Sequence, residues 1–60
     1  MSYVIELANQ LEKVILAKES NDKESYDKES EIYRVLAQKH GVTEEAINYI
    51  LAEIAGGSHE

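Results

Sequence analysis

The sequence contains no cysteine, no proline, no tryptophan and no phenylalanine. Without cysteine the chain has no disulfide, no thiolate ligand for zinc and no thiol nucleophile. Glycine is present only at positions 41, 56 and 57, so little interrupts helix formation. No apolar run approaches the ~20 residues that span a bilayer, and the first residues lack the basic lead and apolar core of a signal peptide. We therefore expect a cytoplasmic protein that does not enter a membrane.

Basic residues are scarce: twelve Asp and Glu oppose six Lys and Arg, which gives a net charge of -6. Affinity for DNA depends largely on neutralising phosphates with Lys and Arg, so the charge disfavours binding to free nucleic acid. It favours a protein partner, particularly a basic one. The 60 residues make one small domain, and a 43% apolar content with 30% charge is typical of a globular chain.

The first part of the chain has the periodicity of an amphipathic helix. We expect a helix over residues 3–17, with Ser2 as its N-cap. Its apolar residues recur at the spacing of one helical face: Val4, Leu7, Ala8, Leu11, Val14 and Ile15. Ile5 and Leu16 fall off this face. They are either ordinary exposed aliphatic side chains or contacts for a dimer or another partner.

Residues 18–30 repeat Lys-Glu-Ser three times at a spacing of five, which matches neither a helix nor a strand. The Asn21-Asp22 pair is the best turn candidate, and Ser20 or Asn21 can cap the helix that follows. The segment is interpreted as a solvated turn leading into a helix, with an acid-rich partner-binding strip as the alternative.

The second helix is expected from Lys23 or Tyr26 through His40. Its apolar arc consists of Tyr26, Ile32, Tyr33, Val35, Leu36 and Ala37. Gly41 suits the left-handed backbone conformation that closes a helix.

Thr43 is expected to cap a third helix that ends near Gly56. The acids in its first turn suit a helix N-terminus. The apolar stripe of this helix is Ala46, Ile47, Ile50, Leu51 and Ile54. The prediction is an all-α fold: a three-helix bundle over residues 1–55 with a flexible tail over 56–60.

Residues 33–52 resemble the helix-turn-helix unit of phage-repressor and Cro-like regulators. The matching positions are Ala37, Gly41, Val42, Thr43 and Ile47. The resemblance implies a tight turn between two packed helices. It also implies that the residues nearest a DNA major groove would be Thr43, Glu44, Glu45, Asn48 and Tyr49. Between Thr43 and Ile54, however, the chain has three acids and no Lys or Arg, which favours a protein over a phosphate backbone.

No catalytic or ligand-binding motif accompanies the fold. The two histidines, His40 and His59, form no Ser-His-acid triad and no His-rich metal motif, and His40 is interpreted as structural or solvated. The Lys-Glu-Ser repeat lacks the spacing and the mid-loop glycine of a calcium loop. We expect no enzymatic activity, no cofactor and no metal.

The sequence thus predicts a small acidic protein-binding module of the inhibitor or antirepressor type, similar to those of phages and mobile elements. It would occupy a site on a basic or nucleic-acid-binding protein. The predicted partner-binding residues are Glu44, Glu45, Asn48, Tyr49 and Glu53. Two alternatives stay open: a dimeric helix-turn-helix DNA-binding regulator, and a self-assembling helical module. A homodimer contact would use Ile5 and Leu16.

Overall fold

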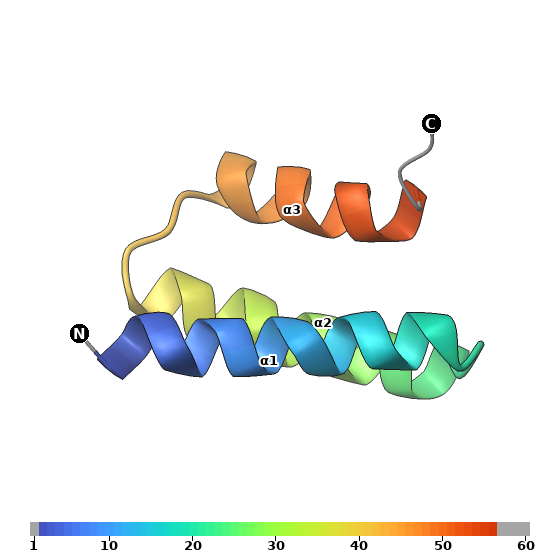
Figure 1. Ribbon diagram of the computed structural model, residues 1–60. Coiled ribbons are helices and arrows are strands. Elements are labelled where there is room, and N and C mark those ends of the chain that lie inside the picture. The colour runs from blue at the N-terminus through green and yellow to red at the C-terminus, as the bar shows by residue number, and fades with distance from the viewer. Residues whose placement is uncertain (1, 57–60) are drawn as a thin grey trace.

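The computed structural model describes residues 2–56, and these residues form three helices and no strand. Helix α1 spans Ser2–Glu19, α2 spans Lys23–Lys39 and α3 spans Glu44–Gly56. The first two helices form an antiparallel hairpin, and α3 packs over the hairpin, running beside α1 in the same direction (Figure 1). The predicted all-α three-helix architecture is confirmed. Of the predicted tail, Gly56 is the last residue of α3, and residues 57–60, including His59, lie outside the described part.

The core is small and lies where the three helices meet. Its buried residues are Val14 from α1, Tyr33 and Ala37 from α2, and Ile47 from α3. Half-buried side chains surround them: Leu7, Leu11, Tyr26, Val42, Ile50, Leu51 and Ile54. Because Ala37 is fully buried and has only a methyl side chain, the neighbouring helices approach closely at this point. The predicted stripe of α3 is the side that faces this core.

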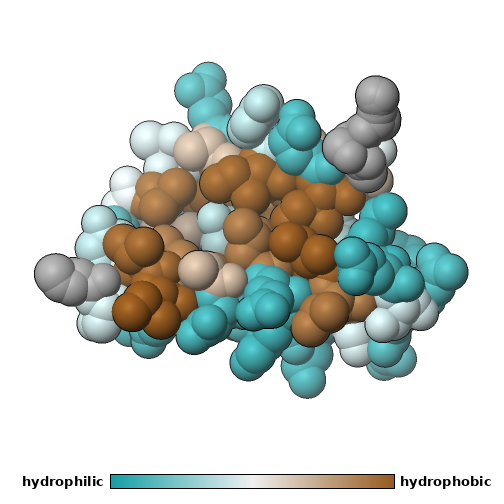
Figure 2. Space-filling view, in the orientation of Figure 1, coloured by the Kyte–Doolittle hydropathy of each residue, from teal (hydrophilic) through white to brown (hydrophobic). Residues whose placement is uncertain are grey.

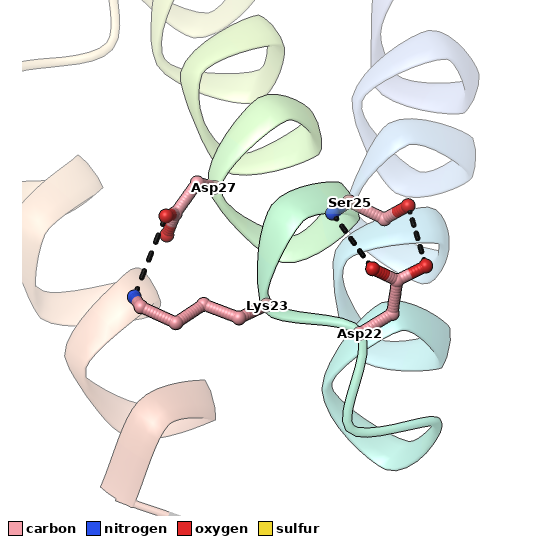
Figure 3. Close-up of polar contacts among 4 residues, drawn as sticks. All are labelled: Asp22, Lys23, Ser25 and Asp27. Carbon is pink, nitrogen blue, oxygen red and sulfur yellow. Dashed lines mark hydrogen bonds and ion pairs between the residues drawn. The ribbon is translucent and has the colours of Figure 1, made fainter.

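The turn between α1 and α2 is held by backbone and side-chain hydrogen bonds. Asn21 has a positive φ of 59°, and the Asp22 N–H donates to the Ala17 carbonyl at 3.1 Å, which closes α1. Asp22 also caps α2: its Oδ1 accepts from the Ser25 N–H at 3.2 Å and its Oδ2 accepts from the Ser25 hydroxyl at 2.8 Å (Figure 3). The expectation that Ser20 or Asn21 caps α2 is therefore wrong, because Asn21 is needed in the left-handed position that ends α1.

The turn between α2 and α3 follows the predicted pattern. Gly41 has φ 87°, and the Val42 N–H donates to the Ala37 carbonyl at 3.0 Å. The Thr43 hydroxyl oxygen accepts from the Ala46 N–H at 3.2 Å and so caps α3. The glycine turn and the threonine cap are both confirmed.

The other difference at a helix end concerns Ser2. The structure places Ser2 inside α1 as its first residue, so the expectation that Ser2 is the N-cap is wrong. The helix also continues two residues beyond the expected end, to Glu19, because the turn that closes it is built by the residues that follow.

Candidate protein-binding surface

Four of the five predicted partner-binding residues lie on the side of α3 that faces away from the hairpin. Glu45, Tyr49 and Glu53 follow one another at a spacing of four, which places them in one row along the helix. Asn48 lies beside this row, and all four residues are exposed. Tyr49 is 67% exposed, the most of any large hydrophobic side chain among residues 2–56. We call Glu45, Asn48, Tyr49 and Glu53 the outer face of α3.

Glu44 lies apart from the outer face. Its Oε2 is 3.4 Å from Nη1 of Arg34 on α2, so its side chain turns toward the neighbouring helix. The glutamate remains 67% exposed, and pairs this exposed contribute little to stability. Sequence spacing could not separate Glu44 from the other acids, because the contact with Arg34 depends on how α3 packs against α2.

The helix dipole explains two of the three acids of α3 but not the third. Glu44 and Glu45 lie in the first turn, where the helix dipole favours negative charge, so the helix start itself accounts for them. Glu53 lies near the C-terminal end, where the same dipole disfavours an acid, and α3 has no basic residue in its last turn. The stability of the helix therefore explains neither Glu53 nor the exposed ring of Tyr49.

A second group of exposed residues lies on α1 and α2. Ile5 and Leu16, which the periodicity places off the buried face, are 63% and 54% exposed. The apolar face that the periodicity predicts for the first helix is only partly covered, since Val4 is 58% and Ile15 is 38% exposed. Ala8 is also exposed.

The apolar arc of α2 is likewise only partly covered. Tyr33 and Ala37 are buried, whereas Ile32 is 41% and Val35 is 57% exposed. The reason is geometric: each helix covers a limited stripe of its neighbours, and the short α3 leaves the far sides of the hairpin open. Figure 2 shows the resulting surface, in which hydrophobic side chains continue from α1 toward α3.

His40 has a structural position at the end of α2. Its ring stacks on the ring of Tyr3, with centroids 4.9 Å apart and planes inclined by 17°. Its Nε2 lies 3.5 Å from Oε1 of Glu6. These contacts join the start of α1 to the end of α2, and they agree with the structural interpretation of His40. The sequence pattern did not indicate Tyr3 and Glu6 as its neighbours.

No three His, Asp or Glu side chains of residues 2–56 lie close enough together to hold a metal ion. An open hollow of about 350 Å³ lies on α2, lined by Glu31, Ile32, Val35, Leu36 and Lys39. Within residues 2–56, no helix has the length and apolar character needed to cross a membrane.

Comparison with protein-family models, with curated proteins and with solved structures finds no match for this chain. Its function is therefore inferred from the chemistry of its own surface.

Proposed function

We propose that this chain is a non-enzymatic protein-binding module that docks the outer face of α3 on a basic site of another protein. The observation that carries the proposal is the exposed Tyr49 ring, which has the carboxylates of Glu45 and Glu53 one helical turn away on either side. Such a module would act as an inhibitor or antirepressor, because it occupies a surface that the partner would otherwise offer to nucleic acid.

The residue types of the outer face suit this role. Tyrosine is enriched among residues that dominate binding energy, because its ring supplies a large contact area and its hydroxyl a hydrogen bond. Acids around such a ring attract a basic partner and orient its approach. Asn48 adds an amide that both donates and accepts. The outer face thus combines a central anchor with a charged rim.

Two observations favour a protein partner over DNA. The first is charge: α3 carries three acids and no Lys or Arg, whereas DNA affinity requires contacts with phosphates. The second is the arrangement of the helices. Figures 1 and 3 both show α3 running beside α2 in the opposite direction, while the recognition helix of a helix-turn-helix crosses its partner steeply.

The proposal is tested by affinity capture from a bacterial lysate with three baits. One bait is the unaltered chain and the second carries Glu45→Lys, Tyr49→Ala and Glu53→Lys. The third is a charge-matched control with Glu19→Lys and Glu24→Lys. Both residues are exposed and lie next to the turn that joins α1 to α2. Circular dichroism first establishes that all three baits are equally helical.

We expect the unaltered and control baits to retain the same basic protein and the outer-face variant to lose it. Capture should also weaken as salt rises, since the Debye length falls from ~10 Å at 0.1 M to ~3 Å at 1 M ionic strength. Equal capture by all three baits would contradict the proposal. So would retention of duplex DNA in place of a protein.

A further inference from the structure

We propose that the outer face of α3 binds arginine in preference to lysine, and that the element it binds is a partner helix with two arginines four residues apart. This inference rests on the proposed function, because it names the chemistry of the partner at the same surface. The observation that carries it is the row of Glu45, Tyr49 and Glu53, in which one exposed aromatic ring lies between two carboxylates.

The three side chains of the row project from one side of α3. At 3.6 residues per turn, the row spans about 80° of the helix circumference. Glu45 and Glu53 each stand about 6 Å along the helix axis from Tyr49, which is the rise of four residues. A glutamate side chain can therefore bring its carboxylate beside the tyrosine ring from either end of the row.

The fold leaves the row available to a ligand. Tyr49 is 67% exposed, and Glu45 and Glu53 are exposed as well. None of the ion pairs and side-chain hydrogen bonds formed among residues 2–56 involves a member of the row. Helix α3 itself has no Lys or Arg that could compete for the two carboxylates.

Glu53 gives a second reason to expect a bound cation. It lies near the C-terminal end of α3, where the helix dipole disfavours a negative charge, and no basic residue in the last turn offsets it. An uncharged or basic residue at this position would favour the helix more. A cation held by the row would remove this unfavourable interaction, which the fold alone does not compensate.

The combination of a ring with carboxylates favours a guanidinium group over an ammonium group. A guanidinium is planar, so it can stack on the Tyr49 ring while its N–H groups donate in their own plane to a carboxylate beside the ring. The ammonium of lysine is compact and more strongly hydrated, and it has no plane to stack. Carboxylates alone would attract both cations, so the ring is what distinguishes arginine from lysine.

The row provides two such positions, one between Glu45 and Tyr49 and one between Tyr49 and Glu53. The centres of these positions are about 6 Å apart along α3. Residues i and i+4 of a helix have the same separation along the axis and lie on one side of it. A partner helix aligned with α3 can therefore place two arginines on the row at once, one on either side of the ring.

The preference is measured with three helical peptides of equal charge, built on one alanine-rich sequence. The first has arginines at positions i and i+4, and the second has lysines at the same positions. The third has arginines at i and i+2, which point to different sides of the peptide helix. Each peptide is titrated at low salt into the whole chain, and the shifts of the α3 amide resonances give the dissociation constant.

We expect the first peptide to bind about fivefold more tightly than the lysine peptide, because a cation stacked on an exposed ring gains roughly this factor. The third peptide should bind more weakly than the first, since it can place only one arginine on the row. Tyr49→Leu should abolish the preference for arginine, whereas Tyr49→Phe should keep it because the ring remains. Glu53→Gln should weaken the binding of the first and second peptides, and the matched control Glu24→Gln, which alters an exposed acid of α2, should not.

Equal affinity for the arginine and lysine peptides, or a preference for arginine that survives in Tyr49→Leu, would overturn the inference. So would the absence of any shift in α3 at millimolar peptide. If a lysate protein is captured through the outer face while the peptides show no preference, the partner is held by charge alone and the proposed function stands. If no captured protein depends on the outer face, the proposed function fails, and the peptide titrations still measure the preference of the row for arginine.

Discussion

The side-chain amide of Gln10 donates two hydrogen bonds to Glu29. Its Nε2 lies 2.7 Å from Oε1 and 3.0 Å from the backbone carbonyl oxygen of Glu29. At 7% exposure, Gln10 is the buried polar side chain of the described residues, and these bonds join α1 to α2. The position carries a sequence signal: Gln10 stands three residues after Leu7 and four before Val14, on the buried side of the helix.

The Gln10–Glu29 contact predicts the effect of an isosteric charge swap. Gln10→Glu would place two carboxylates against one another, so we expect it to destabilise the fold by about 2 kcal/mol or more at neutral pH. Combining it with Glu29→Gln restores an amide and a carboxylate and should recover part of the loss. Urea denaturation of both single variants and the double variant measures the coupling. If the losses of the single variants merely add in the double variant, the bond does not contribute as inferred.

Ile47 and Ile5 provide a matched pair for the core. Ile47 is fully buried, so Ile47→Ala should lower the free energy of unfolding by about 2–5 kcal/mol. Ile5 is 63% exposed, and Ile5→Ala should change it by about 0.5 kcal/mol or less. Thermal or urea unfolding followed by circular dichroism gives both values. Comparable losses at the two positions would contradict the placement of the core.

Gly41 allows backbone conformation to be separated from packing. Its φ is 87°, and a Cβ built on it would meet no atom within 4 Å. Any penalty of Gly41→Ala therefore comes from the backbone alone, and we expect about 1–2 kcal/mol. D-alanine favours positive φ, so a synthetic chain with D-alanine at position 41 should be at least as stable as the natural one. The measurement is the melting temperature of the Gly41→Ala chain and of the chain with D-alanine at position 41, each compared with the natural chain. Equal destabilisation by both substitutions would show that the side chain itself is not tolerated.

Asp22, in the turn between α1 and α2, makes the stability of the fold depend on pH. The Ser25 backbone N–H, followed by the Ser25 hydroxyl, donates to its carboxylate and holds the pKa of Asp22 below its ordinary value of 3.8. A lowered folded-state pKa means that the charged cap stabilises the fold above the ordinary value. That stability is lost as the pH falls through the lower folded-state pKa.

Asp22→Asn tests this relationship, because asparagine keeps a capping oxygen but does not titrate. The stability difference between the natural chain and Asp22→Asn should be constant near neutral pH and shrink on acidification. A difference that does not change with pH would mean that the carboxylate does not act through its charge. Denaturant titrations at a series of pH values provide the measurement.

The parts of the fold that the sequence predicted are those that depend on neighbouring residues. Gly41 and Thr43 mark the second turn because a left-handed backbone and a hydroxyl cap are local requirements. The prediction did not extend to which part of a wide apolar face is covered. Val4 and Val35 have the periodicity of core residues but are exposed, because coverage depends on the length and packing angle of a distant helix.

The candidate surface also has one part that the sequence predicted and one that it did not. The exposure of Tyr49 follows from its position outside the apolar stripe of α3, which the sequence shows directly. The separation of Glu44 from the outer face follows from its contact with Arg34, which only the three-dimensional arrangement reveals.

The three helices are not attached to one another equally. Most of the contact between helices lies between α1 and α2. Helix α3 is held by its apolar stripe, in which Ile47 is buried and Ile50, Leu51 and Ile54 are half-buried, and by the exposed Arg34–Glu44 pair. A weakly attached helix opens locally before the rest of the fold, so the amides of α3 should exchange with solvent hydrogen sooner than those of the hairpin. A protein that binds the outer face of α3 would favour the closed state by mass action. Binding of a partner to the outer face would then slow the hydrogen exchange of the α3 amides and increase the protease resistance of α3, even at residues that the partner does not touch.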